Sequence, residues 1–393
     1  MQNKRDVLKK IILMISILSL SSCSNNKTSI SNNSISNSTN SAVSNPTLKN
    51  ASIEEDTKFN ACIVKISIEE FNNLGFNLGD SLNIKFTNGY ALEDIPYFNG
   101  YYVKNQAPVV VAYPGNEYIL ITLNNLGIWS YVGLSSNDKV DITLNTAKKY
   151  LSTQEALGQS YSLSRDEYDS DEEFSNFRAL KGGSLKENLI YRGASPVDNS
   201  RNRAKCTNDL LEKNSINTIV DLADSEENIN TYFSDSSFSS TYTKNIYDNG
   251  NMILLSMGSG YESDKYKQSV VSGFKFMLTK TGPYYIHCME GKDRTGFVCT
   301  LIEALCGASY EEMRDDYMIT YKNYYKITKE KDSDKYDAIV SLYFHSFLEA
   351  LHGIDDVEEF KTADFQEDAK NYLKQGGMTD TEISDFVKLI CND

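Results

Sequence analysis

The run from His287 to Gly296 reads His-Cys-Met-Glu-Gly-Lys-Asp-Arg-Thr-Gly, and it decides how the second half of the chain folds. The apolar residues 284–286 precede it and are typical of a buried strand, while residues 297–305 continue it as an apolar helix. The run therefore predicts a loop between a strand and a helix. Five residues separate Cys288 from Arg294, a spacing that lets successive backbone N–H groups converge on one phosphate-sized centre.

The side chains of this loop suit phosphate chemistry. The planar guanidinium of Arg294 can hold two phosphate oxygens at once. The N-terminus of the following helix favours both a bound dianion and an ionised Cys288, which can attack phosphorus and form a phosphocysteine. Thr295 can hydrogen-bond the sulfur when it leaves in the second step. We expect the remaining residues of the loop to line the phosphate and substrate site: Met289, Glu290, Gly291, Lys292 and Gly296.

The run resembles the signature loop of the cysteine-dependent protein tyrosine phosphatases. It is closer still to the bacterial tyrosine/lipid phosphatase branch, whose loops read His-Cys-x-x-Gly-Lys-Asp-Arg-Thr-Gly. Residues 189–196, Leu-Ile-Tyr-Arg-Gly-Ala-Ser-Pro, are similar to the branch's Leu-Tyr-Arg-Ser-x-x-Pro segment, and residues 219–222 to its Ile-Asp-Leu-Arg strand. Ala223 stands where the branch has arginine. The resemblance covers about residues 175–393 and implies a phosphatase-like α/β domain that needs no cofactor.

Three charged residues bear on the substrate. Lys292 is either a solvated charge or a contact to a second anionic group of the substrate. Glu290 opposes the second interpretation, because a carboxylate at the mouth of the site repels a highly phosphorylated ligand. This favours phosphotyrosine-bearing peptides over inositol polyphosphates. Arg192 is predicted to contact the substrate, with a buried structural arginine as the alternative.

His287 has two interpretations: it packs beside the cysteine, or it orients the loop and favours the thiolate. The leaving oxygen also needs a proton donor. The wider superfamily carries this acid on a mobile loop before the cysteine, which points to Asp248 or, less well by spacing, to Asp264. The branch that this sequence resembles is thought to use the aspartate inside the loop. Asp293 is therefore the predicted general acid, and the alternative is that it only braces the loop.

The beginning of the chain predicts export and lipid attachment. Basic residues precede the apolar stretch 11–20, which is too short for a permanent membrane span. The sequence Leu-Ser-Ser-Cys that ends at Cys23 resembles the bacterial lipobox, which implies removal of residues 1–22 and a lipid on Cys23. The alternative is a secreted protein with an incidental cysteine. Residues 23–56, rich in Ser, Asn and Thr, predict a flexible tether, so we expect an extracytoplasmic, lipid-anchored protein.

The other cysteines do not indicate a disulfide framework or a metal site. After Cys23 and Cys288, five cysteines remain at spacings without regularity: Cys62, Cys206, Cys299, Cys306 and Cys391. We expect Cys299 and Cys306 to pack in the core, and the alternative is that one is a redox partner of Cys288. His345 and His352 lack a carboxylate pattern that would complete a metal site.

Residues 57–150 predict a small all-β domain, either a barrel or a sandwich. Apolar residues alternate over 82–86 and 140–144, and turn signals such as Asn88-Gly89 separate the short runs. The aromatic residues from Tyr97 to Tyr102 have two interpretations: a binding surface for a peptide or sugar, or filling of the domain and its interface with the next one.

An acidic linker over 151–174 is predicted before the catalytic domain, residues 175–393. There, strand and helix signals alternate, which indicates a mainly parallel sheet flanked by helices. Ser309 with Glu312 and Thr379 with Glu382 have capping-box spacing, and residues 333–351 predict an amphipathic helix.

The net charge of −15 argues against nucleic acid as a partner, because its binding needs a broad basic surface. The expected partners are a phosphorylated protein or small phosphomonoester, and a membrane reached through Cys23. The sequence thus predicts a phosphomonoester hydrolase, specifically a protein tyrosine phosphatase. Two alternatives stay open: a phosphoinositide or inositol phosphate phosphatase, and a non-catalytic module in which the loop only binds an anion.

Overall fold

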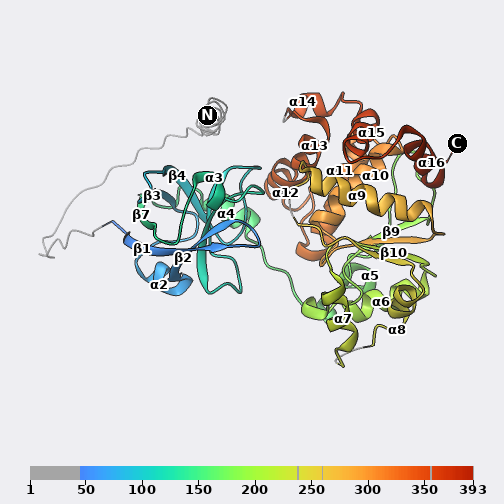
Figure 1. Ribbon diagram of the computed structural model, residues 1–393, viewed down its shortest axis with the longest axis horizontal. Coiled ribbons are helices and arrows are strands. Elements are labelled where there is room, and N and C mark those ends of the chain that lie inside the picture. The colour runs from blue at the N-terminus through green and yellow to red at the C-terminus, as the bar shows by residue number, and fades with distance from the viewer. Residues whose placement is uncertain (1–44, 237–238, 259, 355, 393) are drawn as a thin grey trace, which may run out of the picture.

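The computed structural model describes residues 45–236, 239–258, 260–354 and 356–392. The predicted signal segment, Cys23 and the first part of the predicted tether lie outside these described residues. Within them, no helix combines the length and the apolar character needed to cross a membrane. Figure 1 shows a β-barrel beside a larger α/β unit, and a single connecting segment of the chain joins the two.

The N-terminal unit is a closed barrel of seven strands in the order β1-β2-β6-β5-β4-β3-β7. All neighbouring strands are antiparallel except β4 and β5, which are parallel. The predicted alternation is confirmed over 82–86, where Leu82, Ile84 and Phe86 are buried in the barrel core. The strands are β1 (Thr47–Asp56), β2 (Ala61–Ser67), β3 (Ser81–Phe86), β4 (Ala91–Phe98), β5 (Pro108–Val111), β6 (Tyr118–Leu123) and β7 (Lys139–Thr146). Helices α2 (Ile68–Asn73) and α3 (Trp129–Val132) lie between strands.

The predicted tether is wrong for residues 47–56, which form β1. This strand closes the barrel by pairing with β2 on one side and β7 on the other. Only Ile53 of its residues is buried. The polar residues that suggest a tether thus form the exposed face of a strand, and the partners of this strand lie elsewhere in the chain.

The second unit is built on a five-stranded sheet in the order β11-β10-β12-β9-β8. The first four strands are parallel, as predicted, and only β8 is antiparallel to its neighbour. β12 lies between β10 and β9, so both its edges are paired and all four of its residues are buried. The strands are β8 (Arg178–Ala179), β9 (Ile190–Gly193), β10 (Thr218–Asp221), β11 (Met252–Leu254) and β12 (Tyr284–His287).

Helices cover both faces of this sheet, as Figure 1 shows. Alternate residues of β12 pack on opposite faces of the sheet. Tyr284 and Ile286 belong to the larger core, and Tyr285 belongs to the smaller one. The smaller core is covered by α6 (Ala204–Lys213), α7 (Glu226–Ser234) and α8 (Thr241–Asp248). The larger core is covered by α9 (Asp264–Leu278), α10 (Asp293–Leu305), α11 (Tyr310–Tyr325), α12 (Ser333–Ile339), α13 (His345–His352), α14 (Val357–Phe360), α15 (Phe365–Gln375) and α16 (Asp380–Ile390).

Two local predictions hold and one needs correction. Both capping boxes are present, at the first turns of α11 and α16. The single helix expected over 333–351 is instead α12, a π-helical turn η3 (Val340–Phe344) and α13 in succession. A π turn widens the helix by one residue, so periodicity alone does not reveal it.

The predicted acidic linker is largely folded. It contains α4 (Leu151–Leu157), the 3-10 turn η1 (Arg165–Glu167) and α5 (Asp171–Phe174). Tyr168 and Phe174 are buried and pack against Tyr324 of α11. The acidic residues between 166 and 173 are therefore the outer face of a segment that belongs to the second unit.

Candidate active site

The loop that carries Cys288 lies at the carboxyl edge of the parallel sheet. β12 ends at His287 and α10 begins at Asp293, which is the strand-loop-helix order that the sequence predicts. Cys288 is only 4% exposed. The residue is therefore buried next to the N-terminus of α10, whose first-turn N–H groups have no partner within the helix.

Gly291 gives the loop its tight curvature. Its φ is +65°, and a Cβ there would lie 2.2 Å from the carbonyl oxygen of Gly193 at the end of β9. Any larger residue would collide with this backbone and would also strain its own conformation. The loop is therefore packed directly on the neighbouring strand.

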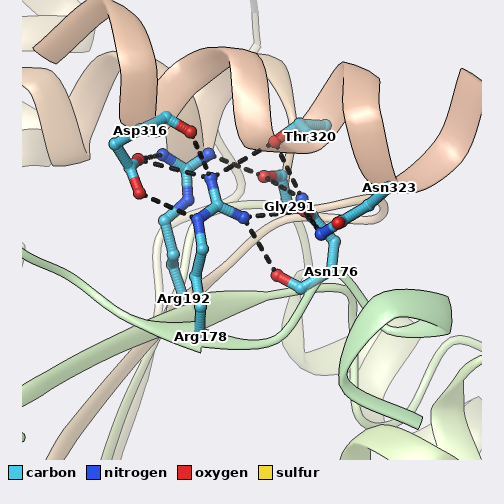
Figure 2. A network of polar contacts seen from close by, with 7 residues as sticks. All are labelled: Asn176, Arg178, Arg192, Gly291, Asp316, Thr320 and Asn323. Atoms are coloured by element: carbon cyan, nitrogen blue, oxygen red, sulfur yellow. Dashed lines mark hydrogen bonds and ion pairs between the residues drawn. The ribbon is translucent and has the colours of Figure 1, made fainter. Parts of the chain in front are cut away.

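A buried polar network holds the outer side of the loop. The carbonyl of Gly291 accepts hydrogen bonds from Arg192 Nη2 at 2.8 Å and from Asn176 Nδ2 at 3.1 Å. Figure 2 shows both arginines, Arg178 and Arg192, reaching from the sheet toward Asp316 on α11. The two donors hold this carbonyl on the Asp316 side of the loop, and a loop of this kind can direct its backbone N–H groups at an anion.

Arg192 is thus placed differently from its predicted role in substrate contact. Its side chain is 1% exposed and bonds to Asp316 Oδ2 at 2.7 Å as well as to Gly291. The alternative, a buried structural arginine, fits this geometry, because the guanidinium braces the loop from behind. Asp316, its partner, and Asn176, the other donor to the Gly291 carbonyl, carry no motif that would identify them in the sequence.

Arg294 lies in the first turn of α10. Its Nη1 donates a 2.9 Å hydrogen bond to the carbonyl of Met257, in the loop that follows β11. Burial works to lower the pKa of Arg294, but nearby acidic groups, Cys288 foremost, raise it overall. The guanidinium is therefore charged and held close to the cysteine.

Two further residues of α10 fit their expected places. Thr295 is fully buried, and its hydroxyl has no hydrogen-bond partner among the described residues, which leaves it available to the cysteine sulfur. Gly296 allows a close helix contact, since a Cβ there would lie 3.0 Å from the rings of Phe347 and Tyr317. Its role is thus the packing of α10, beside any contact with phosphate.

His287 is fully buried at the end of β12. Its Nδ1 lies 3.3 Å from the carbonyl oxygen of Cys288, and its Nε2 lies 3.8 Å from Asp221 Oδ2. Burial lowers the pKa of His287 to about 4. The imidazole is therefore neutral near pH 7, which supports the loop-orienting interpretation and leaves no cation there to stabilise a thiolate.

A pair of buried carboxyls lies next to this histidine. Asp221 ends β10 and pairs with His287 in the sheet, and Asp224 follows it after one turn. Burial raises the pKa of both groups, and for Asp224 the charge of Asp221 adds to the effect. The sequence did not predict either carboxyl as a site residue, although an aspartate at the carboxyl end of a buried strand beside β12 would be a signal for one.

Three charged side chains surround the mouth of the loop. Lys292 Nζ lies 3.9 Å from Glu290 Oε2 and 3.8 Å from Asp293 Oδ2. The surrounding side chains desolvate the carboxyl of Asp293 and raise its pKa above the ordinary value, although Lys292 acts in the opposite direction. Met289, which is 37% exposed, also faces outward here.

The structure distinguishes among the candidate acids. Asp248 ends α8, which leads into β11, so it lies toward the amino edge of the sheet, opposite to Cys288. It also forms an ion pair with Lys244. This placement argues against Asp248 as the acid. Asp264 begins α9 on the correct edge and Asp293 belongs to the loop itself, and both side chains are exposed.

Glu290 is held by residues outside the predicted loop. Its carboxylate accepts a hydrogen bond from Tyr161 and lies 3.4 Å from Arg201 Nε. Its backbone carbonyl accepts a 2.7 Å bond from the hydroxyl of Tyr324. Lys292 and Arg201 help to keep the pKa of Glu290 below its usual range despite burial. Tyr161 comes from the segment predicted as linker, so this contact was missed.

Among the described residues, no group of three or more histidine, cysteine or acidic side chains is arranged to hold a metal ion. The structure also corrects the cysteine assignment. Cys306, at the end of α10, forms a disulfide with Cys391, so it is not a redox partner of Cys288. Cys299 is free and fully buried in the core, as expected.

One comparison with known proteins identifies a family for the second half of the chain. A model of the tyrosine phosphatase family matches residues 172–391. No curated protein matches the chain. Among solved structures, the chain is similar to the core catalytic domain of the PP-IP phosphatase SIW14 from S. cerevisiae, in complex with citrate. That match has 19% identity and a TM-score of 0.26, and it covers 38% of this chain and 77% of the other.

Proposed function

The chain belongs to the tyrosine phosphatase family, and on this premise we propose that it is a cysteine-dependent phosphatase that hydrolyses phosphotyrosine in proteins. The observation that carries the proposal is the placement of Cys288 and Arg294 around one loop between β12 and α10. Thiolate, guanidinium and converging amides supply a nucleophile and charge stabilisation in one place. A module that only binds anions would not need Cys288.

The proposed reaction has two steps. The Cys288 thiolate attacks phosphorus, the bond to the leaving oxygen breaks, and Asp293 gives that oxygen its proton. Water then attacks the phosphocysteine, the S–P bond breaks, and the Asp293 carboxylate accepts the proton of the water. Thr295 hydrogen-bonds the departing sulfur. Arg294 and the loop amides hold the three remaining phosphate oxygens throughout.

The charges at the mouth support phosphotyrosine over inositol polyphosphates. The cation of Lys292 is already paired with the carboxylate of Glu290, 3.9 Å away. A ligand with several phosphates would bring further negative charge against Glu290. A single phosphate on an uncharged ring avoids this repulsion.

The cellular place of this activity is part of the proposal. The lipobox-like sequence before Cys23 supports lipid attachment outside the cytoplasmic membrane. The disulfide between Cys306 and Cys391 also supports this place, because disulfides persist mainly in oxidising compartments. Replacement of Cys23 by alanine should abolish labelling with fatty-acid probes, and undiminished label would reject the proposed anchor.

The decisive experiment compares substrates on the purified full-length protein. We expect turnover of a phosphotyrosine peptide, with a phosphoserine peptide and inositol hexakisphosphate at least roughly 10²-fold slower. Cys288→Ser should abolish turnover yet still bind the peptide, because the donors of the pocket remain. Faster hydrolysis of inositol phosphates would support the phosphoinositide alternative. Residual activity of Cys288→Ser within tenfold of wild type would reject the covalent mechanism.

A further inference from the structure

The barrel touches the second unit at the edge of the sheet that carries the active site. Asn105, in the segment after β4, donates a 3.3 Å hydrogen bond from Nδ2 to Glu262 Oε1. A Cβ on Gly260 would lie 3.6 Å from the carbonyl of Asn125 in the barrel. Both partners belong to the loop after β11, whose Met257 carbonyl binds Arg294. The barrel therefore contacts the same loop whose Met257 carbonyl binds Arg294.

A second contact lies beside the first. Lys104 and Asn105 of the barrel line one small crevice together with residues 341, 342, 346 and 349 of η3 and α13. Figure 1 shows the barrel facing this helical part of the second unit. Contacts to two separate elements fix the side of the barrel that faces the catalytic unit.

Tyr102 lies two residues before Lys104, which lines this contact. Tyr102 is half-buried, and its ring lies 5.5 Å from that of Phe98. Burial raises the pKa of Tyr102 to about 12, and the positive charge of Lys292 acts against this rise. Tyr113 likewise helps to raise the pKa of Arg201, which burial works to lower. The two barrel tyrosines are thus within electrostatic reach of the two cations that flank Glu290.

Lys292 also lies near aromatic rings of α11. Lys292 Nζ lies 5.9 Å from the ring centre of Tyr325 and 6.0 Å from that of Tyr321. Tyr161 meets Tyr325 edge-on at 5.3 Å. Tyrosines of α11 and Tyr102 of the barrel therefore all lie near Lys292 of the Cys288 loop.

We propose that Tyr102 of the barrel is a specificity-determining residue, which together with Tyr325 receives the aryl ring of a phosphotyrosine substrate above the Cys288 loop. The inference rests on the proposed function, and it assigns part of the substrate site to the N-terminal barrel. Aromatic rings gain from offset or edge-on packing with another ring. An aliphatic or acyl phosphate gains nothing from the same surface.

The test uses the full-length protein, a phosphotyrosine peptide and acetyl phosphate, which has no ring. Tyr102→Leu keeps an apolar side chain but removes the ring. We expect KM for the peptide to rise about tenfold with kcat within twofold of wild type, and acetyl phosphate kinetics to stay unchanged. Tyr102→Phe should retain the wild-type preference. Tyr90→Leu is the matched control, because Tyr90 is a half-buried barrel tyrosine at the other end of β4.

A second variant tests whether a defect of Tyr102→Leu arises from the lost ring or from a displaced barrel. Tyr325→Leu, on α11, should produce the same selective loss on the peptide without touching the barrel. Equal losses on both substrates in Tyr102→Leu, or a peptide KM within twofold of wild type, would overturn the inference. The proposed function is judged separately: if wild type shows no Cys288-dependent hydrolysis of the peptide, that function fails. If wild type does hydrolyse the peptide, but Tyr102→Leu keeps the wild-type preference for the peptide over acetyl phosphate, only the proposed role of Tyr102 is rejected.

Discussion

Arg192 Nη2 donates a 2.8 Å hydrogen bond to the carbonyl oxygen of Gly291, and this bond links a buried strand residue to the backbone of the Cys288 loop. The same guanidinium bonds to Asp316 Oδ2 through Nη1, so α11 fixes its position. The arrangement means that the direction of one peptide unit of the loop depends on a residue that no substrate touches.

Arg192→Lys should weaken phosphate binding directly, and not only by lowering the stability of the protein. A single ammonium cannot hold both Asp316 and the Gly291 carbonyl in the planar geometry of a guanidinium. We expect KM and the inhibition constant of vanadate to rise about tenfold, because the loop amides lose their alignment. Asn176→Ala, which removes the other donor to the same carbonyl, should shift both constants in the same direction.

The stability part of this change is measured by urea unfolding. Removing one partner of a buried ion pair costs about 3–5 kcal/mol. Arg192→Lys should cost less than this, because the lysine keeps a positive charge and Arg178 still bonds Asp316. Arg314→Lys is the control, because this arginine of the same helix bonds the more exposed Asp315. A destabilised Arg192→Lys with unaltered KM and vanadate inhibition would make the network purely structural.

Asp293→Asn should discriminate between leaving groups. General acid catalysis acts only where a proton must be delivered, so hydrolysis of an aryl phosphate with a poor leaving group should slow by roughly 10²-fold or more. An ester whose leaving group needs no proton should be hydrolysed at nearly the wild-type rate. Asp264→Asn is the control at the same edge of the sheet. Equal losses on both esters would assign Asp293 to loop architecture and direct attention to Asp264.

The buried pair of Asp221 and Asp224 predicts an unusual dependence of stability on pH. Burial raises the pKa of Asp224 to about 7 in the folded protein, well above its value in the unfolded chain. The folded state therefore binds more protons than the unfolded state between these two values, and this contribution to stability is lost as the pH rises toward 7. His287 acts in the opposite direction, because its folded pKa is depressed to about 4.

Asp224→Asn isolates this contribution, since an amide does not titrate. The free energy of unfolding of the variant minus that of wild type should increase from pH 4 to pH 7 and then level off. Urea titrations at intervals across this range provide the measurement. A difference that is constant with pH would show that Asp224 ionises at its ordinary pKa in the folded state.

The disulfide between Cys306 and Cys391 should stabilise the second unit strongly. It closes a loop with a sequence separation of 85 residues, and the loss of such a constraint is expected to cost about 4 kcal/mol. Replacing both cysteines by alanine should lower the unfolding temperature, and a reducing agent should lower that of wild type to a similar value. The double variant is its own control, because it should not respond to the reducing agent. Wild type that is equally stable with and without reductant would contradict the prediction.

Features that depend on neighbouring residues could be predicted from the sequence. The strand-loop-helix order around Cys288 follows from residues that are continuous in the chain, and the capping box of Ser309 and Glu312 needs only three residues of spacing. The alternating residues of β3 likewise indicated a strand with one buried face. In each case, the backbone geometry of one short segment is enough to bring the participating groups together.

The tertiary structure alone decided the contacts between distant segments. Residues 47–56 became a strand because β2 and β7 supply its hydrogen-bond partners. Arg192 became a support of the loop because Asp316, 124 residues away, packs against it. Cys306 forms its disulfide with Cys391 because the last helix packs against the rest of the unit. Such pairs have no local pattern, since their energy is gained only after both elements are packed, and a single sequence records the residues but not which of them will meet.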